Sequence, residues 1–345
     1  MKNLRITAAA ALLAGAAHAG PIAADPALPA YQPKPVTVAK DAPYRLPDGS
    51  VYIVGNDGMK EMLGQLNTLF TKTHPGVRFT MLLEGSSTGI GGLTAGVSAF
   101  APMGREAWPT DLGGFKEAYG YQPTDIRIGY DGYARGIGQK NPPAIYVNAK
   151  NPLAGLNMSQ VMRLFTQGAP GGDITQWRSL GLGGEWAQRA IHVYGPRDDG
   201  GFATSTRVAL LGGRTFTPRY EPSPKFAETM KAVAADPYGI ALGQWGDPGP
   251  LAPNVKLLPL APKDGTAFAL PTPENVQAGR YPMAPHLHVY VNRAPGKPLD
   301  PLVKEYLRLA LSREGQAIIA ALPPADEPYV PLTAAEAAQE LAKLD

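Results

Sequence analysis

Three glycine-rich segments most constrain how this chain of 345 residues can fold, because each follows a strand-like run and precedes a helical pattern. They read VGNDGM at 54–59, EGSSTG at 84–89 and GPRDDGG at 195–201. A strand that enters a helix through such a loop leaves free backbone N–H groups at the first helical turn, and these groups attract anions. The sequence therefore predicts an α/β fold with small-anion sites at strand ends.

The N-terminus has the pattern of a removable export signal over residues 1–19. Two basic residues precede an apolar run, which ends in the small-x-small cleavage pattern Ala17-His18-Ala19. No later apolar run is long enough to span a membrane, and the absence of cysteine excludes both disulfides and an N-terminal lipid-anchored cysteine. We expect a soluble periplasmic protein without a lipid anchor, beginning at Gly20.

Length and composition indicate how many lobes the chain forms and which partners its charge favours. The chain is longer than one hydrophobic core usually supports, which favours two lobes. Lys+Arg 32 and Asp+Glu 29 nearly balance, so the charge gives no support for nucleic-acid or membrane-surface binding. Residues 20–44 are rich in proline without clear periodicity, which predicts an extended N-terminal segment.

Apolar periodicity predicts alternating strands and helices along the rest of the chain. The strand-like runs are 51–54, 77–83, 126–128, 144–147, 191–194 and 288–291. The helical patterns are 59–70, 159–165, 226–235 and 301–320, with a weaker, glycine-rich one at 90–96. This alternation favours mainly parallel sheets with helices on both faces and ligands at the carboxyl ends of strands.

The ordered set of segments resembles the phosphate substrate-binding proteins of ABC importers over about residues 50–332. It comprises VGNDGM, HPGVRF, EGSSTGIGGLTAG, APMGREAW, DITQWRSLGLGGEWAQRAIHVYG, DPYGIALG and YPMAPHLHVYVNRAPGKPLDPLVKEYLRLALSREGQ. The resemblance implies a type II periplasmic-binding fold, with two α/β lobes joined by a double-crossover hinge. Lobe 1 would comprise 45–140 and 262–345, and lobe 2 would comprise 141–261.

The resemblance also implies a function and its partners. The protein would capture phosphate or a related tetrahedral oxyanion between its lobes and present it to an ABC transporter permease. It would be a monomer, would not be an enzyme, and would use no cofactor, metal or catalytic residue.

Phosphate chemistry explains the ligand-binding residues that the resemblance implies. An anion taken out of water must recover its hydration as hydrogen bonds from N–H groups and hydroxyls, and arginine adds charge-assisted bonds. Asp57, with Asp199 or Asp198, can accept the proton of monohydrogen phosphate, which sulfate lacks. The implied ligand-binding residues are Asn56, Asp57, Gly58, Ser86, Ser87, Thr88, Arg105, Arg197, Asp199, Gly200 and Gly201.

Several positions depart from the family pattern. Asn56 and Gly58 stand where the family has Ser and Thr, and Gly104 stands where it has Ser. Gly200-Gly201-Phe202 replaces the usual Ser-Gly-Thr. Because these changes remove donor hydroxyls, a degenerate secreted binding module with weak or no phosphate affinity is an alternative function.

A serine hydrolase is a second alternative. Residues 85–89 match G-x-S-x-G with Ser87 at its centre, and Asp199 and His286 follow in hydrolase order. The helix after the motif is too rich in glycine to fix a strained turn, and an HGGG-type oxyanion segment is absent from the sequence. These two features disfavour the hydrolase.

The remaining polar and aromatic candidates have structural interpretations. His286 and His288 share a strand face, but the sequence places no carboxylate or cysteine near them, which disfavours a metal site. We expect Trp177, Trp186 and Trp245 to pack in the core rather than stack on a ligand. Arg105 beside Glu106 has the alternative interpretation of a surface pair.

Overall fold

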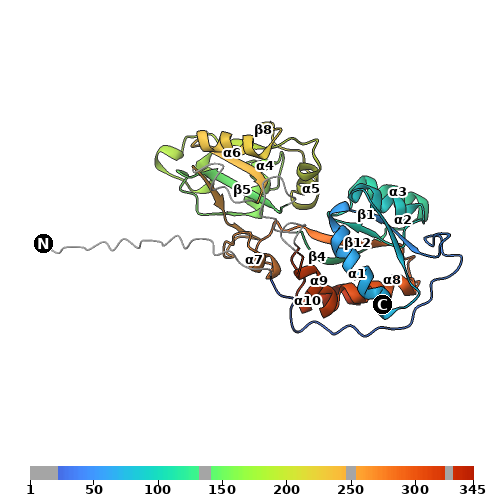
Figure 1. The fold of residues 1–345 in the computed structure, drawn as a ribbon. Helices are drawn as coiled ribbons and strands as arrows, with labels where there is room; N and C mark the ends of the chain where they lie inside the picture. Colours follow the sequence, from blue (N-terminus) through green and yellow to red (C-terminus); the bar gives the residue numbers. More distant parts are fainter. Residues whose placement is uncertain (1–21, 132–140, 246–253, 323–328) are drawn as a thin grey trace.

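The computed structural model describes residues 22–131, 141–245, 254–322 and 329–345. Two α/β lobes are visible in Figure 1. The expected export signal at 1–19 lies outside the described residues, and the predicted change of lobe at 140–141 falls at the edge of an undescribed stretch. No helix within the described ranges is long and apolar enough to cross a membrane.

Lobe 1 contains a mixed sheet in the order β2-β1-β3-β12-β4. The strands β1 and β2 pair in parallel, and β12 lies antiparallel between β3 and β4. Backbone bonds from Ala99 N to Tyr52 O and from Asn56 N to Pro102 O, both 2.9 Å, join the two groups of strands. The strands are β1 Val51–Gly55, β2 Phe79–Leu83, β3 Ala101–Met103, β4 Thr124–Tyr130 and β12 His286–Val291.

Lobe 2 repeats this order as β8-β7-β9-β5-β10. Each lobe thus has one strand, β12 or β5, that is antiparallel to both neighbours and comes first after the chain changes lobe. The expectation of mainly parallel sheets was therefore wrong for these two strands. The strands are β5 Pro143–Asn148, β7 His192–Pro196, β8 Tyr220–Ser223, β9 Gly239–Gln244 and β10 Val255–Leu258.

Two short strands within residues 141–261 form a separate pair. β6 Leu156–Asn157 pairs in parallel with β11 Leu260–Ala261. The helices of lobe 2 are α4 Met158–Phe165, η2 Trp177–Leu180, η3 Gly184–Trp186, α5 Gly201–Leu210 and α6 Phe226–Ala235. The other helices are η1 Asp57–Met59, α1 Lys60–Thr73, α2 Ser86–Thr94, α3 Pro109–Tyr119, α7 Pro273–Gln277, α8 Pro301–Ala310, α9 Arg313–Ala320 and α10 Ala334–Ala342.

The predicted helix 301–320 is two helices, α8 and α9, that meet at a corner. Ser312 caps α9 by accepting a hydrogen bond from Gly315 N at 3.2 Å. A Cβ at Gly315 would lie 2.1 Å from the Leu309 carbonyl oxygen, so the close approach at the corner needs glycine. The apolar spacing continues through the corner, which is why periodicity alone does not reveal the break.

Helices from the C-terminal part of the chain cover the lobe 1 sheet. The Tyr306 ring on α8 lies among Phe70, Phe79 and Phe100, with ring centroids 5.5, 5.4 and 4.7 Å away. Gln316 on α9 donates from Nε2 to the Ile128 carbonyl of β4 at 2.9 Å. The last part of the chain therefore completes the core around the first strands.

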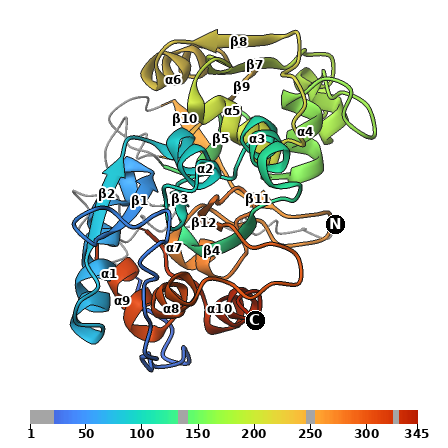
Figure 2. The ribbon, with the colours of Figure 1, turned by 90° about the vertical axis from the view of Figure 1, so that its right-hand side faces the viewer.

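The extended N-terminal segment, residues 22–44, is attached to the same helices. Figures 1 and 2 show it running alongside α8 and α9. Glu305 on α8, 3% exposed, accepts from Tyr31 Oη and Lys34 N at 2.9 Å each. Arg313 N donates to Pro29 O at 2.9 Å. These contacts attach the segment to the lobe 1 surface.

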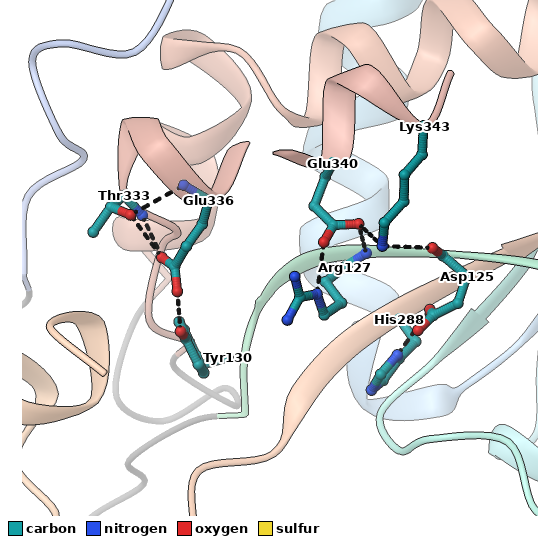
Figure 3. Close-up of polar contacts among 8 residues, drawn as sticks. All are labelled: Asp125, Arg127, Tyr130, His288, Thr333, Glu336, Glu340 and Lys343. Atoms are coloured by element: carbon teal, nitrogen blue, oxygen red, sulfur yellow. Dashed lines mark hydrogen bonds and ion pairs between the residues drawn. The ribbon is translucent and has the colours of Figure 1, made fainter. Parts of the chain in front are cut away.

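Helix α10 is attached to β4 by a buried carboxylate (Figure 3). Glu340 is fully buried and accepts from Arg127 N at 3.0 Å, Arg127 Nε at 2.6 Å and Lys343 Nζ at 2.6 Å. Lys343 Nζ also donates to the Asp125 carbonyl at 3.0 Å. The helix begins with a capping box between Thr333 and Glu336. These contacts fix the C-terminus on the edge strand of the sheet.

Candidate functional site

Side chains and backbone from the first two glycine-rich loops meet in lobe 1. Asn56 follows β1, is 7% exposed, and donates from Nδ2 to Ser86 Oγ at 2.8 Å. Ser86 begins α2, and its Oγ also accepts from Gly104 N, after β3, at 3.0 Å. The ends of three neighbouring strands are therefore connected through one hydroxyl.

The other two hydroxyls of the second loop have different partners. Thr88 donates from Oγ1 to the carbonyls of Gly85 and Gly55 at 2.8 and 3.3 Å, and its N–H donates to Gly85 O at 3.0 Å. Ser87 is exposed and accepts a long bond of 3.4 Å from Arg105 Nη2. In this structure, the donors of Thr88 are therefore used by carbonyls of its own loop and of the end of β1.

Arg105 is held in place by contacts that the sequence interpretation missed. Its Nη1 lies 2.8 Å from Asp111 Oδ2, and its Cζ lies 3.8 Å from the ring centroid of Trp108. Its contact with Glu106 is to the backbone carbonyl, at 3.0 Å, so the considered Arg105–Glu106 charge pair was wrong. The pattern Trp-Pro-Thr-Asp, with proline in the first turn of α3, was the available signal for Asp111 as a capping residue.

The rest of the first loop contacts the C-terminal part of the chain. Asp57 is exposed and begins η1, directly after Asn56. The Gly58 carbonyl accepts from Tyr329 Oη at 2.8 Å. Sequence patterns gave no indication of Tyr329, because this contact joins residues 271 positions apart.

The third loop leads from β7 into α5 in lobe 2. Arg197 forms an ion pair with Asp199 in which both side chains are more than 60% exposed, and Arg207 on α5 binds Asp198 at 3.0 Å. Gly200 is the N-cap of α5, and Gly201 is its first residue.

Figure 1 shows α5 on the side of lobe 2 that faces lobe 1. The hydrogen bonds and ion pairs described for the third loop stay within lobe 2. The convergence of all three loops on one interlobe cleft therefore stays a prediction.

The three residues of the considered hydrolase triad lie in different surroundings. Ser87 contacts Arg105, and Asp199 pairs with Arg197 in lobe 2. The His286 ring packs against the ring of Tyr130 on β4, tilted by 32° with centroids 4.3 Å apart. These contacts give no support to a catalytic triad.

The histidine pair on β12 has a carboxylate beside it, contrary to the sequence expectation. His288 Nδ1 lies 2.9 Å from Asp125 Oδ1, because β4 runs antiparallel to β12 and brings a distant residue alongside. In the part of the chain that the structure describes, no group of three or more His, Cys, Asp or Glu residues is placed to hold a metal ion. One carboxylate and one imidazole form a structural pair here.

Burial, together with the nearby charges of Arg127 and His288, lowers the pKa of His286 from its ordinary 6.5 to about 3. Above pH 6.5 the ring is neutral in both the folded and unfolded states. Below pH 6.5 only the unfolded state gains the proton, so stability falls as pH falls toward 3. We expect His286 to lower the free energy of unfolding by about 2 kcal/mol between pH 7 and pH 5.

His286→Gln tests this expectation, because glutamine does not titrate. Denaturant unfolding at pH 7 and pH 5 should show a smaller loss of stability in the variant than in the wild type. An equal loss in both proteins would exclude His286 as the source.

The tryptophans pack in the core, as expected. Trp177 and Trp186 are buried and meet edge to face at 5.7 Å, and Trp245 is partly buried against the same core. A cavity of about 390 Å³ lies elsewhere, beside β6 and β11, and is lined in part by Asn157, Asp264 and Phe268. That cavity is separate from the residues of the three loops.

Comparison with known proteins places these features in a family. The model of the PBP superfamily domain matches residues 42–314. The phosphate-binding protein PstS of Pseudomonas aeruginosa is 32% identical over 349 residues, which cover 100% of this chain and 99% of that protein.

Two solved structures have a similar fold. PstS from Borrelia burgdorferi aligns with a TM-score of 0.54 at 16% identity, over 82% of this chain and 99% of the other. An ABC-type phosphate transport receptor from Vibrio cholerae aligns with a TM-score of 0.51 at 17% identity, over 81% and 99%. At these identities the two structures support the type II periplasmic-binding fold alone.

Proposed function

Because this chain belongs to the PBP superfamily, in the family of the phosphate-binding protein PstS, we propose that it captures phosphate or a related tetrahedral oxyanion for an ABC importer. The observation that carries the proposal is the identity to PstS over the whole chain. We further propose export with removal of residues 1–19, a soluble periplasmic location and a monomer. A catalytic role is not part of the proposal.

The donors of lobe 1 support anion binding. Ser86 and Ser87 occupy the first turn of α2, where backbone N–H groups face away from the helix. Arg105 lies beside them and is 11% exposed in its side chain. A guanidinium has five N–H donors, so Arg105 can bind an oxyanion while keeping its bonds to Asp111 and Ser87.

We propose that the third loop supplies the lobe 2 side of the site. Gly200 and Gly201 begin α5, which offers a second helix N-terminus. Arg197 and Asp199 are exposed and paired with each other, so closure of the lobes would place a cation and a carboxylate against the ligand. Lobe closure would remove part of this pair's water, a cost that hydrogen bonds to the anion would have to offset.

Calorimetric titration of purified, phosphate-stripped protein tests the function. We expect phosphate and arsenate to bind tightly, and sulfate and molybdate to bind weakly or not at all. Failure of all four anions to bind would favour a degenerate binding module, in which Gly58, Gly104 and Gly200 have removed too many hydroxyls.

Asp57→Asn tests how the anion is chosen. A carboxylate facing an anion is unfavourable unless a ligand proton lies between them, whereas an amide can donate to either anion. We expect about 10-fold weaker phosphate binding, as for the loss of one charged hydrogen bond, and a smaller margin over sulfate. Asp41→Asn, at an exposed position of the N-terminal segment, is the control. Unchanged phosphate affinity in Asp57→Asn would remove this residue from the site.

A further inference from the structure

The hydroxyl of Ser86 has both of its acceptor positions filled from within the protein. A serine hydroxyl has one proton and two lone pairs. Asn56 Nδ2 and Gly104 N approach Ser86 Oγ at 2.8 and 3.0 Å, and each can only donate to it. The proton of Ser86 must therefore point to a third partner, and the residue is partly exposed at the start of α2.

Asn56 is held in place by the surrounding protein, so its side chain is not free to move with a ligand. Its side chain is mostly buried, and its backbone N–H donates to Pro102 O at 2.9 Å. A Cβ at Gly104 would lie 3.3 Å from Asn56 Nδ2 and 3.4 Å from both Cγ and Oδ1. These distances are tight, so a side chain at position 104 would press on the Asn56 amide. Glycine at this position avoids that contact.

We infer that Asn56 is a positioning residue that acts on the bound anion through Ser86, and that Gly104 provides the space for it. This inference rests on the proposed function. It differs from the sequence expectation, in which Asn56 binds the ligand directly. The contrast with Thr88 supports it, because that hydroxyl donates to the carbonyls of Gly85 and Gly55 and is not available to an anion.

The arrangement favours an anion for a simple reason. A hydroxyl that is free to rotate can donate or accept, and binding must then fix its orientation. Ser86 already has its proton directed outward, so an oxyanion meets a donor without that cost. Removing Asn56 would free one lone pair and allow Ser86 to rotate.

A double-mutant cycle between Asn56 and Ser86 tests the inference, with phosphate as the titrant. We expect Ser86→Ala to weaken binding at least about 10-fold, and Asn56→Ala about 5- to 10-fold, as for one charge-assisted hydrogen bond. The double variant should bind like Ser86→Ala alone, because Asn56 then has no hydroxyl to orient. Multiplication of the two single effects would overturn the inference.

Gly104→Ala provides an independent readout of the same coupling. Its Cβ should press on the Asn56 amide and weaken phosphate binding several-fold in the wild-type background. The effect should vanish in the Asn56→Ala background, where a methyl group replaces the amide. An equal loss in both backgrounds would show that Gly104 acts independently of Asn56. Gly91→Ala, where a Cβ on α2 meets open space, is the matched control.

The outcomes separate the inference from the proposed function. Thermal unfolding of each variant, with and without phosphate, identifies any that fail to fold, and the remaining variants complete the comparison. If the wild type binds no oxyanion, both the proposed function and the inference fail. If it binds phosphate and the cycle is additive, only the inference fails.

Discussion

Glu340→Gln is expected to lower the free energy of unfolding by about 3 kcal/mol, the low end for breaking a buried ion pair. The carboxylate is fully buried and accepts three hydrogen bonds, from the backbone and side chain of Arg127 and from Lys343. A glutamine side chain has one carbonyl oxygen and one NH2 group, so at least one of the three donors would face the NH2 group instead of an acceptor. We expect a value at the low end of that range because the side chains of Arg127 and Lys343 are 32% and 38% exposed. Water can therefore replace part of their lost hydrogen bonding.

Denaturant unfolding measures this effect, with Glu117→Gln on the exposed face of α3 as the control. The control should change stability by less than about 0.5 kcal/mol, as is usual for surface substitutions. A double replacement, Arg127→Leu with Glu340→Leu, should recover part of the loss, since apolar pairs often replace buried ion pairs well. Equal stability of Glu340→Gln and wild type would show that α10 is held mainly by its apolar contacts.

Local patterns predicted the elements in which apolar spacing is clear, such as α4 and α6. β1, α1 and β2 were predicted because apolar spacing and the glycine-rich loops coincide there. β3 was missed because Ala101–Met103 is too short to show alternation. The antiparallel placement of β12 and β5 was also missed, because it follows from the change of lobe and not from any feature of those strands.

The sequence showed which loops form the candidate site. It did not show which groups of those loops can donate a hydrogen bond to a ligand. Ser86 and Thr88 are both hydroxyl residues of one loop, yet the Thr88 hydroxyl donates to backbone carbonyls, whereas the Ser86 hydroxyl accepts from two N–H donors. In the proposed site, the hydroxyl that serves an anion depends on Asn56 and Gly104, which follow other strands. The partners of Arg105 likewise lie on α3, so its role could not be separated from that of a surface charge by sequence alone.

Gly55→Ala is expected to destabilise the protein by roughly 3 kcal/mol, the upper part of the usual range for overpacking. A Cβ at Gly55 would lie 2.3 Å from the Pro102 carbonyl oxygen and 2.7 Å from Pro102 Cγ. That carbonyl already accepts from Asn56 N, so the backbone of β3 would have to move away from β1. Glycine is thus required by the close approach of two strands.

The same substitution should also weaken phosphate binding by more than about 10-fold, because a 1 Å displacement is enough to break well-placed hydrogen bonds. The displaced strand leads directly into Gly104 and Arg105, and Gly55 O accepts from Gly85 N at 3.1 Å in the second loop. Calorimetry and thermal unfolding on one sample measure both effects. Gly64→Ala on α1, where a Cβ meets open space, should instead gain up to about 1 kcal/mol and bind phosphate normally. Loss of stability without loss of binding in Gly55→Ala would mean that the strand ends do not determine the geometry of the anion site.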